Sequence, residues 1–228
     1  MNEIKYFTQG SKNPFNLVAT LKYKYQFLRD NPDFFNPSGI WVFCGAQGSG
    51  KTLSAIDCLF KMMKKYPKAL VVSNLDIKGV EYIKFTDYQQ LIDLDNGTDG
   101  IIFFIDEIHI LWNSLESKDI PISEMACFCQ MRKNRRVIIG TSQVYSRITK
   151  PIREQLKYCI DCNNILNIIQ VNNIMDVSNV IEDSSGHIHG DVVKRQIWFH
   201  YPELYKSYDT LFKIERIERK KKGVIYYG

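Results

Sequence analysis

Residues 45–52 read Gly-Ala-Gln-Gly-Ser-Gly-Lys-Thr, which is a glycine, four residues and then Gly-Lys-Thr. This is the pattern of a phosphate-binding loop (P-loop). The apolar run 40–44 precedes the loop, and a helical pattern from Lys51 to about Lys65 follows it and closes before Pro67. A strand, a glycine loop and a helix in this order are the context that a true site requires. The segment therefore predicts a nucleotide-binding α/β fold.

Each position of the loop has a chemical reason. The glycines let the backbone curl until successive N–H groups point at phosphate oxygens, and the N-terminus of the following helix adds its partial positive charge. Lys51 is expected to reach the β- and γ-phosphates of ATP, and the Thr52 hydroxyl to ligate Mg²⁺. The alternative is a glycine-rich turn with an incidental lysine. The predicted nucleotide-binding residues are Gly45, Gln47, Gly48, Ser49, Gly50, Lys51 and Thr52.

An apolar strand that ends in two acids lies downstream, at Ile101 to Ile105 followed by Asp106 and Glu107. In P-loop proteins such a strand delivers a carboxylate beside the loop, so Asp106 is predicted to hold Mg²⁺. Glu107 is one residue further along, so its side chain points in another direction than that of Asp106. We expect it to polarise the attacking water as a general base. In the alternative, Glu107 only begins the next helix and complements its dipole. The second acid favours hydrolysis over transfer to a bound acceptor.

The run Val137 to Thr141 continues into Ser142 and Gln143. In a parallel sheet this strand ends at the same edge as the P-loop. Gln143 is therefore predicted to sense the γ-phosphate or to orient the water, and local hydrogen bonding in a loop is the alternative. Arginines commonly stabilise the negative charge on a phosphoryl group during its transfer. The candidates around this strand are Arg132, Arg135, Arg136, Arg147 and Arg153.

Apolar runs alternate with helical patterns along most of the chain. The predicted strands are 40–44, 69–73, 101–105, 137–141 and 158–161, and the predicted helices between them are 51–65, 89–94, 107–116 and 122–134. This alternation predicts a RecA/ASCE-like P-loop NTPase fold, with a central parallel sheet flanked by helices.

The pattern changes beyond residue 163. Alternating runs at 165–183 and 191–199, joined through 184–186, predict an antiparallel β-hairpin appended to the sheet. We expect one compact domain with three parts: an N-terminal helical lead (1–38), a P-loop ATPase core (39–163) and a C-terminal hairpin with a basic tail (164–228).

Thirty Lys and Arg against 25 Asp and Glu give a net charge of +5, which permits a polyanionic partner. Basic residues gather at 132–136 and 219–222, where each cluster is either a solvated face or a phosphate contact. No apolar run approaches the roughly 20 residues that span a bilayer, so we expect the chain in the cytoplasm. The six cysteines are expected to be buried, reduced thiols. A zinc site is the alternative, with Cys127, Cys129, Cys159 and Cys162 as its ligands.

These motifs resemble those of the P-loop ATPases of the HerA/FtsK superfamily, and within it the zonular occludens toxin (Zot)-like assembly or packaging ATPases of phages. The resemblance covers about residues 38–212. It rests on the loop and the Asp106-Glu107 pair, and further on Gln130-Met131-Arg132-Lys133, Gln143 and Tyr208-Asp209-Thr210. Zot-like proteins of filamentous phages usually continue into a membrane span, which is not seen before Gly228. A soluble motor therefore fits better than a membrane-anchored one.

The resemblance implies a Mg-ATP-hydrolysing motor that moves viral DNA as a homo-oligomeric ring, typically a hexamer. It implies that Arg132 enters a neighbour's ATP site, with Arg135 as the second choice. Such a motor docks on a capsid or portal-vertex protein, in the host cytoplasm or as part of the virion. Lys220 to Lys222 are expected to anchor nucleic acid or an acidic partner face.

Three other functions are compatible with the sequence. A small-molecule or nucleotide kinase shares the strand, loop and helix, but it leaves Glu107 and Gln143 without a task. A scaffold that binds ATP in order to assemble has no need of a general base. A helicase or plasmid-mobilisation motor of the same superfamily differs from a packaging motor only in the chain's length and in the resemblance near Tyr208.

Overall fold

The computed structural model describes residues 13–32, 34–115, 120–183 and 187–208. The chain divides into two compact units, Met1–Phe34 and Phe35–Gly228. In the first unit, the predicted leading helix is present as α2 (Pro14–Asp30). It begins after Asn13, whose side chain accepts a hydrogen bond from the Phe15 N–H at 3.0 Å, and a proline follows directly. Both features are typical of a helix start.

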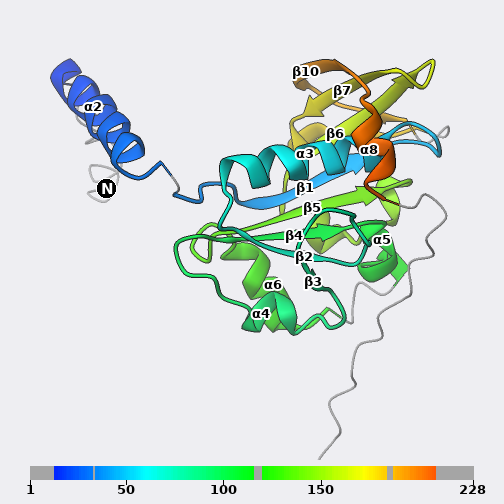
Figure 1. Ribbon diagram of the computed structural model, residues 1–228, viewed down its shortest axis with the longest axis horizontal. Helices are drawn as coiled ribbons and strands as arrows, with labels where there is room; N and C mark the ends of the chain where they lie inside the picture. The colour runs from blue at the N-terminus through cyan, green and yellow to red at the C-terminus, as the bar shows by residue number, and fades with distance from the viewer. Residues whose placement is uncertain (1–12, 33, 116–119, 184–186, 209–228) are drawn as a thin grey trace, which may run out of the picture. The chain divides into compact units, whose positions relative to one another are not determined.

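An eight-stranded sheet forms the centre of the second unit (Figure 1). Its order is β10-β7-β6-β1-β5-β4-β2-β3, and the six strands from β6 to β3 are paired in parallel. The α/β fold with a mostly parallel central sheet is therefore confirmed. The strands are β1 (Gly39–Cys44), β2 (Leu70–Ser73), β3 (Ile83–Lys84), β4 (Ile101–Ile105), β5 (Arg136–Ser142), β6 (Leu156–Ile165), β7 (Ile169–Met175) and β10 (Val192–Phe199).

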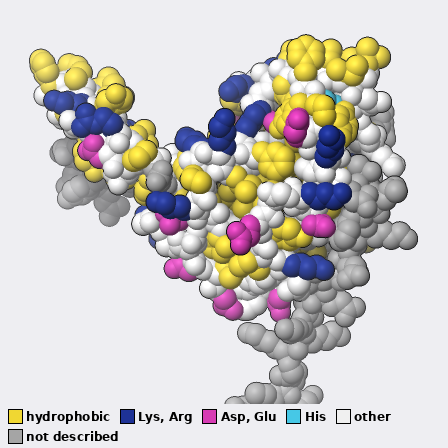
Figure 2. All heavy atoms as spheres, viewed as in Figure 1, with side chains coloured by type: hydrophobic (Ala, Val, Ile, Leu, Met, Phe, Trp, Pro, Cys, Tyr) yellow, Lys and Arg dark blue, Asp and Glu magenta, His cyan; other side chains and the backbone are white. Residues whose placement is uncertain are grey.

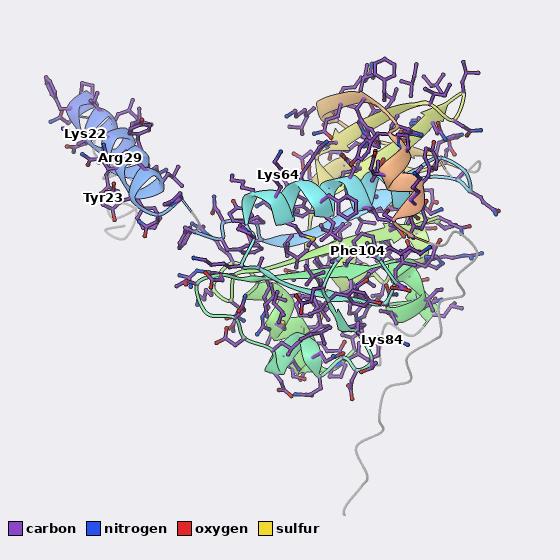
Figure 3. The ribbon with its side chains drawn as sticks, in the orientation of Figure 1. Lys22, Tyr23, Arg29, Lys64, Lys84 and Phe104 are labelled. Carbon is purple, nitrogen blue, oxygen red and sulfur yellow. The ribbon has the colours of Figure 1, made fainter. Side chains whose placement is uncertain are left out.

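Helices cover both faces of this sheet, as Figure 1 shows. One face carries α3 (Lys51–Lys65) and α8 (Pro202–Lys206), and the other carries α4 (Gln90–Asp93), α5 (Ile108–Leu111) and α6 (Ile122–Cys129). Neighbouring residues of β4 serve the two cores: Phe103 packs in the cluster of Leu91, and Phe104, labelled in Figure 3, packs in the cluster of Ile56. Because side chains of a strand alternate, a continuous apolar run is what a strand buried on both faces requires.

The predicted C-terminal hairpin is present, but its strand boundaries differ. β6 runs on to Ile165 and turns through Leu166 and Asn167, whose φ angles of 54° and 56° are left-handed. β7 then returns antiparallel to β6, and β10 pairs antiparallel with β7. The single strand predicted at 165–183 is wrong: it contains β7, a 3₁₀ turn and β8 (Ile181–Glu182), which pairs with β9 (Ile188–His189). The predicted joining residues 184–186 lie outside the described residues.

Apolar side chains lie exposed on this part of the sheet. They include Ile165, Leu166, Ile168, Ile197 and Phe199, and Figure 2 shows hydrophobic side chains gathered over the β7 and β10 region.

Two predicted helices are shorter than expected. The helix predicted at 107–116 is only Ile108–Leu111, because Glu107 is left-handed with φ 51° and Asn113 pairs with Ile148 instead of continuing the helix. The helix predicted at 122–134 ends at Cys129. Turns follow it, and Arg135 adopts a left-handed φ of 48° before β5.

Arg136, one of the predicted phosphate-contacting candidates, is buried at the start of β5. Its guanidinium donates to the carbonyl oxygens of Leu91, Ile92 and Leu94, the last at 2.5 Å. These carbonyls lie at the end of α4, where helical partners are missing. A role for Arg136 on DNA or in a neighbour's site is therefore wrong, because its guanidinium is buried and both terminal nitrogens donate within the core.

The six cysteines are free thiols, of which Cys44, Cys127, Cys159 and Cys162 are buried. Within the described ranges, no three His, Cys, Asp or Glu side chains are grouped so that they could hold a metal ion. Among the same residues, no helix combines the length and the apolar character needed to cross a membrane.

Candidate active site

The loop 45–52 joins the carboxyl end of β1 to the start of α3. Its first turn is closed by the Ser49 N–H, which donates to the Ala46 carbonyl at 3.1 Å. The first bond within α3 runs from the Ser54 N–H to the Gly50 carbonyl at 2.9 Å, so the N–H groups of residues 50–53 have no acceptor within the helix. The Ser49 hydroxyl is also buried without a hydrogen-bond partner among the described atoms. Unpaired donors at a helix N-terminus fit the phosphates of a nucleotide.

Thr52 and Asp106 come together across 54 residues of sequence, since the Thr52 hydroxyl donates to Asp106 Oδ1 at 3.3 Å. The Thr141 hydroxyl donates to the same oxygen at 2.6 Å. Asn74, at the end of β2, holds the backbone of Asp106 from both sides, with its amide oxygen 2.8 Å from the Asp106 nitrogen and its amide nitrogen 2.9 Å from the Asp106 carbonyl. A hydroxyl and a carboxylate are the hard oxygen ligands that Mg²⁺ prefers. The residues present therefore fit the ion.

The Asp106 carboxyl is buried, and this burial raises its pKa, while the hydrogen bond from Thr141 opposes the shift. We expect the Asp106→Asn variant to melt at a higher temperature than wild type at neutral pH in EDTA. A raised pKa means that the folded state binds the proton more tightly than the unfolded state, so stability falls as pH rises above the ordinary pKa of a carboxyl group. The asparagine side chain of the variant carries no charge at any of these pH values, so the variant does not lose stability in this way.

Thermal melting at neutral and acidic pH measures the effect. The advantage of Asp106→Asn should shrink in acid, where the wild-type carboxyl is protonated. Addition of Mg²⁺ with an ATP analogue should then raise the melting temperature of the wild type more than that of the variant. A variant that melts below wild type at neutral pH without Mg²⁺ contradicts the prediction.

Glu107 follows directly in a left-handed conformation, and its N–H donates to the Thr141 hydroxyl at 2.9 Å. Its Oε1 accepts a hydrogen bond from Gln143 Nε2 at 2.9 Å and lies 3.8 Å from Lys51 Nζ. A strained backbone at such a position is common in functional sites, since it aims a side chain that a regular helix would turn away. The structure thus brings the predicted Glu107, Gln143 and Lys51 into one group.

His109 also belongs to this group, although the sequence motifs predicted no role for any of the four histidines. Its Nδ1 lies 3.2 Å from Glu107 Oε2 and 3.1 Å from the Ser142 hydroxyl. Burial lowers the pKa of His109, Glu107 raises it and the nearby Arg147 lowers it. The net shift is downward, so the imidazole is neutral at neutral pH.

The predicted trans-acting Arg132 is not part of this group. It is exposed in the turn that precedes β5, whereas Gln143 follows the carboxyl end of the same strand. Arg132 therefore lies at the edge of the sheet opposite to its own P-loop. Arg135, the second choice, donates to the Gly97 carbonyl at 3.1 Å. The predicted anchor Lys220 to Lys222 lies outside the described residues.

Tyr208 belongs to the segment that the resemblance singled out, together with Asp209 and Thr210, which lie outside the described residues. It pairs with Ile77 just after β2, and burial raises the pKa of Tyr208 to about 12, with a further contribution from the charge of Asp106. Tyr208 thus lies at the edge of the sheet that carries the site.

Comparison with known proteins places the fold. The N-terminal domain of zonular occludens toxin from Neisseria meningitidis has a TM-score of 0.54 and 15% identity, over 75% of this chain and 99% of that domain. The genome packaging NTPase B204 from Sulfolobus turreted icosahedral virus 2, in complex with ATP-gammaS, has a TM-score of 0.48 and 12% identity, over 69% of this chain and 100% of that one. The sequence matches no protein-family model and no curated protein.

The first of these comparisons confirms, for the fold, the resemblance seen in the motifs. The central sheet, the glycine loop between β1 and α3, and the acids after β4 agree with it. This chain has the P-loop NTPase fold, and it shares that fold with the N-terminal domain of zonular occludens toxin.

Proposed function

We propose that this chain hydrolyses Mg-ATP and uses the hydrolysis to move DNA, as a viral genome-packaging or assembly motor that works as a ring. The position of Glu107 carries the proposal. Its carboxylate lies 2.9 Å from Gln143 and 3.8 Å from Lys51, beside the Thr52–Asp106 pair. A second acid at this place serves the activation of water, which hydrolysis needs and phosphoryl transfer to a bound acceptor does not.

The roles of the residues follow from their contacts. Thr52 and Asp106 would hold Mg²⁺, which when bound neutralises charge on the phosphates. Lys51 and the free N–H groups at the start of α3 bind phosphate oxygens. Glu107 accepts the proton of the attacking water. Gln143 orients the Glu107 carboxylate and, because it is exposed, can exchange this bond for one to the γ-phosphate.

The DNA-moving part of the proposal has separate support. The motifs resemble those of Zot-like packaging ATPases, and the fold is similar to that of the zonular occludens toxin domain. Arg132 is exposed at the edge opposite to the chain's own P-loop, where it can meet a neighbouring copy of the chain. The proposed partners are viral DNA, further copies of the same chain in a ring, and a capsid or portal-vertex protein.

ATP turnover, measured against protein concentration with and without single- and double-stranded DNA, tests the proposal. A ring motor should show turnover that rises cooperatively with protein concentration and increases with DNA. The Arg132→Ala variant should lose about a thousandfold of this turnover, and Lys133→Ala, which removes the same charge from the next residue, should lose little. Turnover independent of concentration, DNA and Arg132 would overturn the motor and favour a kinase. Binding without turnover would favour the ATP-gated scaffold.

Mixing two inactive variants tests the trans arrangement directly. A subunit with Arg132→Ala retains Glu107, and a subunit with Glu107→Gln retains Arg132. If Arg132 acts in a neighbour's site, mixed rings contain some interfaces with both groups intact, so the mixture regains part of the wild-type turnover. A mixture as inactive as its components contradicts a trans role for Arg132.

A further inference from the structure

Gln170, in β7, has a fully buried side chain. Its amide nitrogen donates to the Ser49 carbonyl at 3.0 Å and to Asn172 Oδ1 at 3.0 Å. Its amide oxygen lies 3.1 Å from His200 Nε2. A primary amide offers two N–H donors and one carbonyl acceptor, and each of these has a partner here. The amide of Gln170 is therefore held in one orientation.

The Ser49 carbonyl belongs to the same peptide unit as the Gly50 N–H. This unit is planar and trans, so its C=O and N–H point in opposite directions. When Gln170 binds the Ser49 carbonyl, it sets the direction of the Gly50 N–H on the other side. That N–H is the first of the row, residues 50–53, that has no acceptor within α3.

Other polar groups hold Gln170 from behind. Asn172 Oδ1 also accepts a hydrogen bond from the Ser54 hydroxyl at 3.1 Å, and His200 Nδ1 lies 2.5 Å from the Tyr205 hydroxyl. Burial lowers the pKa of His200, and the Tyr205 hydroxyl beside its Nδ1 also donates to the Asn167 carbonyl at 2.8 Å. Because the Gln170 oxygen can only accept, the bond between His200 and Gln170 requires a proton on Nε2. The network ties β10 and α8 to the P-loop.

We infer that Gln170 is a positioning residue of the nucleotide site: from the antiparallel hairpin it aims the Gly50 N–H at a phosphate of bound ATP, and Asn172 and His200 fix its amide. The inference rests on the proposed binding of Mg-ATP. It makes the hairpin part of the phosphate site, although 121 residues separate Gln170 from Ser49 in the sequence.

Equilibrium titration with Mg²⁺ and a non-hydrolysable ATP analogue tests the inference, at a temperature where melting curves show every variant folded. Gln170→Met keeps the length of the side chain but removes its donors, and we expect its Kd to rise about tenfold or more, the effect of misaligning one donor to a charged phosphate. His200→Phe frees the amide to rotate, and we expect a smaller rise of about threefold. Ser54→Ala is the matched control: it loses a bond in the same buried network without touching Ser49. Its melting temperature should fall while its Kd rises far less than that of Gln170→Met, because Ser54 acts on the amide only through Asn172.

The outcomes separate this inference from the proposed function. A wild-type Kd for Gln170→Met overturns the inference, and so does a rise for Ser54→Ala as large as that for Gln170→Met, since the network is then merely structural. If Gln170→Met does not fold, an unchanged Kd for His200→Phe overturns it. If the wild type binds nucleotide but does not hydrolyse it, the proposed hydrolysis is contradicted and the inference about Gln170 is not. No binding by the wild type overturns both.

Discussion

The Glu107→Gln variant is expected to bind Mg-ATP about as well as wild type and to hydrolyse it about a hundred- to ten-thousandfold more slowly. The amide has the size of the carboxylate and can still accept the 2.9 Å hydrogen bond from Gln143, so the site keeps its shape. It cannot accept the proton of the attacking water. The lost 3.8 Å ion pair with Lys51 should change nucleotide affinity little, because Lys51 turns to phosphate oxygens when they are present.

Single-turnover release of phosphate and equilibrium titration of an ATP analogue measure the two quantities separately. Glu154→Gln is the matched control, because it is the same substitution at an exposed position, where the carboxylate lies 3.8 Å from Lys150 Nζ. Its turnover should equal that of wild type. Glu107→Gln turnover within threefold of wild type contradicts a general-base role and leaves Glu107 as the capping residue that precedes a short helix.

The parts of the site that lie in short, contiguous motifs could be predicted from the sequence. The loop 45–52 and the pair Asp106-Glu107 each follow a continuous apolar run, β1 and β4, and both runs are buried on two faces. Because parallel strands end at one edge, the motifs were enough to expect Thr52 beside Asp106, and the two side chains lie 3.3 Å apart.

Groups that reach the site from other elements were missed. Asn74 had a usable signal, since it follows the strand β2, which ends at the same edge as Asp106. Gln170 and His200 had none. Their place beside the P-loop depends on the turn at Leu166 and Asn167, which adopts left-handed angles without a glycine to reveal it.

Within the basic cluster 132–136, positive charge alone did not predict which side chains are exposed. Arg132 and Arg136 look equivalent in the sequence, yet one is exposed and the other is buried against the end of α4. Burial depends on which carbonyls lack partners nearby, and this is a property of the folded chain.

The Gly50→Ala variant is expected to lose nucleotide binding and about 3–4 kcal/mol of the free energy of unfolding. Gly50 has a left-handed φ of 79°, which a side chain disfavours. A β-carbon would also lie 2.9 Å from Gln170 Cδ. Gln170 cannot withdraw without breaking its bonds to Ser49 and Asn172, so either the loop or the network must move. Denaturant unfolding and titration with an ATP analogue measure both losses.

Two other glycines separate backbone strain from collision. Gly48 and Gly79 have φ angles of 81° and 78°, and none of the described heavy atoms lies within 4 Å of a β-carbon built on either. Alanine at each should therefore cost only the strain, about 1–2 kcal/mol. The excess loss in Gly50→Ala then measures the collision, and adding Gln170→Ala should remove much of this excess without restoring nucleotide binding. If Gly50→Ala is no less stable than Gly48→Ala, Gln170 does not pack on the loop. The claim that the hairpin positions the phosphate-binding backbone is then contradicted.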